Sequence, residues 1–110
     1  MPLVVQKPKI LAGQSLSDVV DATGGTAMFL VAPVDWTSAN VSFQLSADGV
    51  IFGDLFIRGI EHIVPLNAGT AVALPDVQTV KNTYLRIRSG SRDYPVAQAA
   101  DREFQIAVST

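Results

Sequence analysis

The feature that most constrains the fold is the stretch Val41–Ser46, in which apolar and polar residues alternate strictly. Successive side chains of a β-strand point to opposite faces, so the apolar residues of this stretch share one face that we expect to be buried. Asp48-Gly49 follows, and both residue types tolerate the positive φ angles of a tight turn. A second apolar run covers residues 50–57. The region therefore predicts a β-hairpin with residues 41–46 and 50–57 as its arms.

The second arm carries apolar residues on both faces. Phe52 and Phe56 share one face with Asp54 between them, while three aliphatic residues fill the other. Such a strand needs cover on two sides, and we expect a second sheet on one side and a neighbouring chain on the other. Residues 26–34 are apolar at nearly every position. This run likewise predicts a strand covered on both faces.

Turn-forming residues separate several further short runs. The segment 83–89 alternates cleanly, with Leu85 and Ile87 expected to point inward. Residues 96–100 are ambiguous and fit a short helix. The remaining predicted strands are residues 15–21, 60–66, 71–74 and 103–108. This succession predicts an all-β fold, an antiparallel β-sandwich of jelly-roll-like architecture.

The first 14 residues differ from the rest of the chain. Pro2 and Pro8 remove backbone donors and favour extended structure around them. We therefore expect residues 1–14 to form an extended N-terminal arm, either an edge strand or a strap that docks on a partner. The alternative is a disordered leader. The chain has 110 residues, so we expect residues 15–110 to form a single β-sandwich domain.

The composition suggests contact with other chains. Charged residues make up 16% of the chain, against about 25% in ordinary soluble domains, and the mean hydropathy is +0.31. A small domain with few charges tends to cover part of its apolar surface with another chain. We therefore expect an oligomer or a lattice contact. The alternative is a sandwich covered on its outside by uncharged polar residues.

Charge and hydropathy argue against two classes of partner. The net charge is -2, whereas nucleic-acid-binding domains usually carry a basic stripe. The longest apolar run, residues 27–34, is far shorter than a membrane-spanning helix, and the N-terminus lacks the apolar segment of a signal peptide. We expect no nucleic-acid or membrane partner. Cysteine is absent, so the redox compartment is left open.

Residues suited to catalysis or metal binding are sparse. The single histidine, His62, follows Glu61, and on a strand the two side chains point to opposite faces, so they do not form a metal pair. Asp48 and Asp54 fit neither the ligand spacing of a calcium loop nor an acid–base pair in a cleft. We expect a non-enzymatic protein without metal or cofactor, and a structural role for His62.

Arg86 and Arg88 share a predicted strand face with Tyr84. Their guanidinium groups could bind carboxylates of a partner. We favour ion pairs with Asp93, Asp101 or Glu103, within the chain or between chains. Trp36 precedes the first hairpin strand. It could stack on a sugar ring, but a lone Trp more often fills the core or an interface.

Two sets of spaced residues resemble a pattern in small structural proteins of tailed bacteriophages. The first set is Trp36-x2-Ala39-x-Val41-x-Phe43-x2-Ser46-x-Asp48-Gly49-x2-Phe52. The second set is Tyr84-Leu85-Arg86-x-Arg88-Ser89-Gly90, followed by Pro95-Val96-x-Gln98 and Arg102-x-Phe104. Together they span residues 36–104, and the N-terminal third is unmatched.

The resemblance is closest to capsid decoration (cement) proteins. It implies a β-sandwich homotrimer on the exterior of the virion capsid, assembled in the host cytoplasm and bound to the major capsid protein. It implies no catalytic residues. The alternative function is a carbohydrate- or receptor-binding module of a tail or fibre. The candidate interface residues are Leu3, Val4, Val5, Ile10, Trp36, Phe52, Phe56, Tyr84, Arg86 and Arg88.

Overall fold

The computed structural model describes residues 2–77 and 83–110 and is all-β. Its strands pair antiparallel in two larger sheets and two small two-stranded ones. Among the described residues, no helix has the length and apolar character needed to span a membrane. The all-β fold class predicted from the alternating runs is confirmed.

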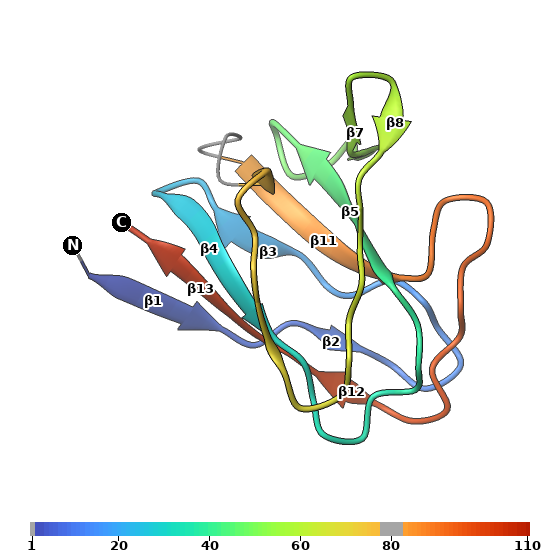
Figure 1. The fold of residues 1–110 in the computed structure, drawn as a ribbon. Coiled ribbons are helices and arrows are strands. Elements are labelled where there is room, and N and C mark those ends of the chain that lie inside the picture. The colour runs from blue at the N-terminus through green and yellow to red at the C-terminus, as the bar shows by residue number, and fades with distance from the viewer. Residues whose placement is uncertain (1, 78–82) are drawn as a thin grey trace.

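The four-stranded sheet joins the two ends of the chain (Figure 1). Its strands, in spatial order, are β1 (Leu3–Gln6), β13 (Gln105–Ser109), β4 (Thr26–Val31) and β10 (Ala71–Ala73). The N-terminal strand β1 lies at one edge and pairs antiparallel with the C-terminal strand β13. Part of the predicted arm is therefore an edge strand of the chain's own sheet.

The five-stranded sheet is organised around the two cleanly alternating segments of the sequence. Its strands are β3 (Val20–Ala22), β11 (Thr83–Ser89), β5 (Val41–Ser46) and β6 (Gly53–Asp54), with β9 (Ile63–Val64) also paired to β5. The two-stranded sheets are β2 (Lys9–Ile10) with β12 (Arg102–Glu103), and β7 (Phe56–Ile57) with β8 (Ile60–Glu61). The predicted strands at residues 41–46 and 83–89 are confirmed with these bounds.

One hydrophobic core receives side chains from both larger sheets. Phe43 and Ile87 enter from the five-stranded sheet, and Leu30 and Ile106 from the four-stranded sheet, all fully buried. Phe104 lies between the last two strands, and its ring meets the ring of Trp36 edge-on at 5.1 Å. Burial of such side chains stabilises the fold by about 1.5–3 kcal/mol each.

The predicted hairpin forms, but its second arm is shorter than expected. Of the predicted second arm, only β6 pairs with β5, through Gln44↔Asp54 and Leu45↔Gly53. The chain then leaves this ladder and folds into a second hairpin, β7–β8, around Arg58 and Gly59, which have φ angles of 55° and 79°. One continuous strand over residues 50–57 was therefore the wrong prediction. Two residues with positive φ fit the tight turn that reverses β7 into β8.

The loop between β5 and β6 is held by Asp48. Its Oδ1 accepts hydrogen bonds from the backbone N–H of Val50 at 2.9 Å and of Ile51 at 3.0 Å. These bonds, and one from the hydroxyl of Ser46, lower the pKa of Asp48. Gly49 has a φ of 80°, which a side chain would disfavour. The turn chemistry predicted for Asp48-Gly49 is confirmed.

The apolar run 26–34 is not a strand covered on both faces. The strand β4 ends at Val31, and Val34 beyond it is 87% exposed. Within β4, Leu30 is buried but its neighbour Phe29 is 37% exposed. The prediction fails because the sheet has the core on one side only. Two other strand predictions shift: β3 begins at Val20, and residues 60–66 divide into β8 and β9.

Candidate functional site

The outward faces of the two larger sheets carry different chemistry. On the five-stranded sheet, cross-strand pairing joins Arg86 to Gln44 and Arg88 to Ser42. Directly opposed residues of a β-ladder share a face, and these residues alternate with buried Leu85 and Ile87. This outward face is therefore polar and charged. We call it the arginine face.

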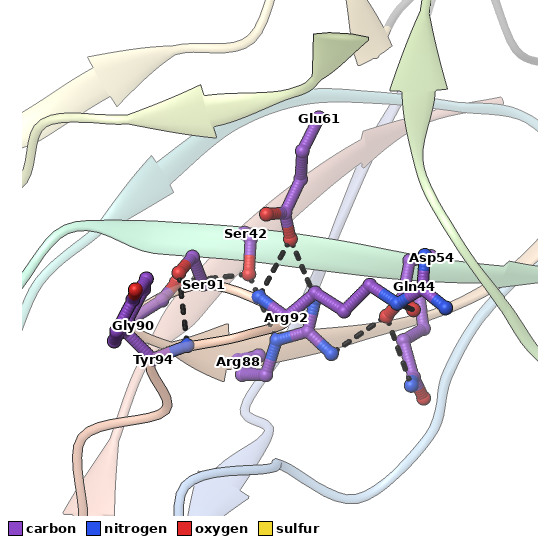
Figure 2. Close-up of polar contacts among 9 residues, drawn as sticks. All are labelled: Ser42, Gln44, Asp54, Glu61, Arg88, Gly90, Ser91, Arg92 and Tyr94. Atoms are coloured by element: carbon purple, nitrogen blue, oxygen red, sulfur yellow. Dashed lines mark hydrogen bonds and ion pairs between the residues drawn. The ribbon is translucent and has the colours of Figure 1, made fainter. Parts of the chain in front are cut away.

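Arg88 is the centre of the arginine face (Figure 2). Its Nη1 donates to Asp54 Oδ1 at 2.6 Å, and its Nη2 donates to Glu61 Oε2 at 2.8 Å. Its Nε donates to the hydroxyl oxygen of Ser42 at 3.0 Å, and that hydroxyl donates to the carbonyl of Gly90 at 2.9 Å. The guanidinium thus has a partner on all three nitrogens, which a buried cation requires.

The second hairpin, β7–β8, covers Arg88. It brings Glu61 over the face, and the backbone N–H of Arg92 donates to the same Glu61 Oε2 at 2.8 Å. The Arg92 Nε lies 3.4 Å from Asp54 Oδ2. Two carboxylates and two guanidinium groups therefore form one network. Intrachain ion pairing of Arg88 is confirmed, but with Asp54 and Glu61 and not with the predicted partners.

The network controls the ionisation of Asp54. Burial by itself raises the pKa of this carboxyl, whereas hydrogen bonds from Arg88 and Gln44 and the charges of Arg88 and Arg92 lower it. The attractive contributions prevail, and the pKa of Asp54 lies below its ordinary value. Asp54 is therefore a carboxylate at neutral pH, as an ion pair with Arg88 requires.

Aromatic rings cover the other cations of the arginine face. The guanidinium carbon of Arg86 lies 3.9 Å from the ring centre of Phe52, within the range of a cation–π contact. The corresponding distance from Arg92 to Phe56 is 6.0 Å. Atoms of the Tyr84 ring approach the backbone at Gly49. These side chains are occupied by contacts within the chain.

The four-stranded sheet presents a different outward face. Cross-strand pairing aligns Val5, Ala107, Phe29 and Ala73 in one row across all four strands. Phe29 and Ala107 alternate with buried Leu30 and Ile106, so the row faces away from the core. The same alternation places six strand residues beside the row: Leu3, Thr26, Val31, Ala71, Gln105 and Ser109. None of these strand residues is charged. We call this surface the uncharged face.

The uncharged face is open to solvent. Leu3 and Val5 are each about half exposed, at 53% and 54%. Ala71 and Ala73 are exposed along β10, whereas Ala107, between Val5 and Phe29, is 2% exposed. An apolar face of this kind on a small domain is typical of a contact with another molecule.

The candidate interface residues are divided among three environments. Leu3 and Val5 belong to the uncharged face, and Val4 pairs with buried Val108 on the core side of the sheet edge. Four others lie on or around the arginine face: Phe52, Phe56, Tyr84 and Arg86. They make the intrachain contacts described above. Phe56 is also 44% exposed.

Three of these residues lie inside the protein. Ile10 is 0% exposed, Trp36 6% and Arg88 7%. Ile10 and Trp36 belong to the hydrophobic core, and the indole N–H of Trp36 donates to the carbonyl of Ala39 at 3.1 Å. They present almost no surface to a partner, which corrects their assignment as interface residues. Trp36 fills the core, as one of the two sequence interpretations proposed.

Sequence reasoning missed most of the uncharged face and a second buried arginine. Phe29 was expected to be covered as part of the run 26–34, and Ala107 was given no role. Their shared row depends on pairing between strands that are distant in the sequence. Arg102 donates to Asp35 Oδ2 at 3.0 Å and to Gln98 Oε1 at 3.1 Å. No local signal in the sequence distinguishes this buried arginine from a surface one.

His62 is packed in the structure. Its ring stacks on Phe43 with centroids 6.1 Å apart, and its Nδ1 lies 4.0 Å from Asp76 Oδ2. Among residues 2–77 and 83–110, no group of three histidine, aspartate or glutamate side chains is arranged to hold a metal ion. A structural role remains our interpretation of His62.

Comparison with known proteins adds no assignment: no protein-family model matches the sequence, and no curated protein matches it.

Proposed function

We propose that this protein is a non-enzymatic structural component of a tailed-bacteriophage virion, a decoration protein that binds and stabilises the capsid. In this proposal, the two larger sheets face each other as a β-sandwich of jelly-roll-like architecture around their shared core. The protein is assembled in the host cytoplasm and sits on the capsid exterior. The resemblance of residues 36–104 to phage structural proteins supports the assignment, and it implies a homotrimer.

The observation that carries the proposal is the uncharged face. Its residues come from four strands and include no charged side chain, so it can be covered by protein without burying an unpaired charge. Covered apolar area contributes about 25 cal/mol per Å². A modest contact of this kind, repeated over a capsid lattice, gives large total stability through multivalency.

The test is the thermal stability of capsids with and without the protein. Capsids that carry it should release their DNA at a higher temperature than capsids that lack it, and Phe29→Asp should remove the difference. Val50→Asp is the control, because Val50 is also an exposed apolar residue, at 79%, but lies outside the uncharged face. Equal release temperatures with and without the protein would refute clamping.

A second candidate function is carbohydrate or receptor binding on a tail or fibre. Trp36 is buried and therefore cannot stack on a sugar ring, but Tyr94 is 80% exposed. Tyr94 borders an open hollow of about 240 Å³ that also touches Ile63 and Ser91. An exposed ring beside a hollow can stack on a sugar. A glycan array with the protein and its Tyr94→Ala variant distinguishes this candidate, which predicts glycan binding that the substitution abolishes.

A further inference from the structure

The edge strand β1 has an open outer side (Figure 1). In the part of the chain that the structure describes, β1 pairs with β13 alone. Three of its residues are about half exposed, Leu3 at 53%, Val4 at 45% and Val5 at 54%, and none of its four residues is charged. Native edge strands are usually protected against a further strand by charges, prolines or bulges. β1 itself carries no protecting charge.

The prolines on either side of β1 do not block its outer side. In an antiparallel strand, the backbone groups of successive residues point to opposite edges. The carbonyl of Pro2 accepts from the N–H of Thr110 at 3.1 Å, and that of Pro8 accepts from the N–H of Phe104 at 2.9 Å. Both prolines therefore face the interior of the sheet, and the donors that they lack are missing on that side.

The odd-numbered residues face the outer side, as Lys9 demonstrates. The N–H of Lys9 donates to Asp18 Oδ1 at 2.9 Å, and its carbonyl accepts from the N–H of Asp18 at 3.1 Å. At the equivalent positions of Leu3, Val5 and Lys7, no described residue supplies such a partner. Each of them leaves one N–H and one C=O for another strand.

The other edges of the two larger sheets are shorter or already occupied. On the outer side of β3, the backbone of Asp21 donates to and accepts from the side chain of Gln6. Just after β10, the N–H of Leu74 donates inward to the carbonyl of Met28, so the next residue, Pro75, faces outward without a donor. β6 and β9 have two residues each. Among these edges, β1 is the longest one open to pairing.

From this arrangement we propose that the outer side of β1 accepts an extended apolar segment of the binding partner as a further strand of the four-stranded sheet. The inference rests on the proposed function, in which this partner is the major capsid protein. Leu3 and Val5 belong to the uncharged face, so a capsid segment beside β1 continues the same contact.

Strand addition explains both the free backbone groups and the exposed side chains of β1. Main-chain hydrogen bonds hold an added strand, and its side chains pack on those of the strand that it joins. Those on the outward face cover Leu3 and Val5, and those on the opposite face cover Val4. The contact thus combines directional hydrogen bonds with burial of apolar surface.

Hydrogen exchange tests the pairing without any substitution. Capsids that lack the protein are loaded with it, and deuterium uptake of free and capsid-bound protein is compared by mass spectrometry with residue-level fragmentation. The outward amides of Leu3, Val5 and Lys7 should exchange at least about tenfold more slowly on the capsid. The internal control is β3, whose outer side is already occupied and whose exchange should stay the same.

A proline substitution tests the outward donor directly. Val5→Pro removes the central outward N–H but keeps the bonds from β1 to β13, which the even-numbered residues make. It should weaken binding to the same capsids at least about tenfold in a co-sedimentation assay. Val5→Thr is the matched control, because it keeps the N–H and the shape of the side chain, and should bind like the native protein. Thermal unfolding shows whether both variants remain folded.

The outcomes separate this inference from the proposed function. Native protein that binds capsids without slower exchange in β1, or equal capsid binding by folded Val5→Pro and Val5→Thr, would overturn the inference and leave the proposed function standing. Native protein that does not bind capsids would overturn both. If Val5→Pro does not fold, the exchange experiment alone decides.

Discussion

The arginine face and the uncharged face arise from the same alternation of strand residues, but their outward side chains differ in whether they find partners within the chain. On the arginine face, the hairpin β7–β8 folds back and supplies Glu61 to Arg88, and Asp54 of β6 completes the pair. On the uncharged face, Phe29 and Val5 stay in part exposed. The charged face is therefore closed within the chain, whereas the apolar face is left in part open to solvent.

This contrast reverses the expectation from charge alone. Arg86 and Arg88 were candidate interface residues for which ion pairs within or between chains were expected. Their contacts lie within the chain, on Phe52 for Arg86 and on Asp54 and Glu61 for Arg88. The sequence pattern gave no role to the alanines of β10 and β13, yet they complete the central row of the uncharged face, in which Val5, Phe29 and Ala73 stay exposed. The substitutions below compare the contributions of the two faces to the free energy of unfolding.

The largest effect is expected where the arginine face is most deeply buried. Arg88→Met removes the cation that Asp54 and Glu61 share and leaves two carboxylates close together without it. We expect the free energy of unfolding to fall by about 3 kcal/mol, measured by urea denaturation. The matched control is Arg92→Met, because Arg92 is mostly exposed and should cost less than about 1 kcal/mol. Equal losses of unfolding free energy in both variants would show that the buried Arg88 contributes no more to stability than the exposed Arg92.

The ion pair also predicts a response to acid. The folded pKa of Asp54 is lowered, so its contribution to stability is fully present above the unfolded pKa of about 3.9. That contribution is lost as the pH falls through the lower, folded pKa. The free energy of unfolding of Asp54→Asn should therefore decrease less than that of the native protein between pH 6 and pH 2. Parallel pH profiles for the two proteins would contradict the lowered pKa.

A smaller effect is expected for the ring that covers Arg86. Phe52→Leu keeps an apolar side chain but removes the ring that faces the guanidinium 3.9 Å away. A double-mutant cycle with Arg86→Met should give a coupling of about 0.5–1 kcal/mol. A coupling near zero would mean that Phe52 covers the arginine face only as apolar surface.

The smallest effect is expected on the uncharged face. Val5→Thr replaces a methyl group by a hydroxyl on a half-exposed side chain, and should change the free energy of unfolding of the dilute protein by less than about 0.5 kcal/mol. Val108→Thr makes the same change on the buried side of this sheet, where it should cost about 1–3 kcal/mol. Similar values for both would mean that the uncharged face is already covered within the monomer.

The sequence predicted the strands best where local rules act alone. The alternation in residues 41–46 and 83–89, and the turn at Asp48-Gly49, depend on side-chain period and backbone preference. The run 50–57 was harder, because its hydrophobic pattern allows one long strand. The break after Asp54 depends on the hairpin β7–β8, which brings Glu61 to Arg88, a contact that no local pattern encodes.

The sequence alone thus determined the local structure: which segments are extended, where the chain turns, and that the fold is all-β. Tertiary structure alone decided the role of each outward face. Arg88 is neutralised by carboxylates 34 and 27 residues away in the chain. Val5 lies beside Ala107, and Ala107 beside Phe29, only because β13 pairs with β1 on one side and with β4 on the other. Both outcomes depend on contacts between distant segments, because a β-ladder sets neighbours by register and not by position along the chain.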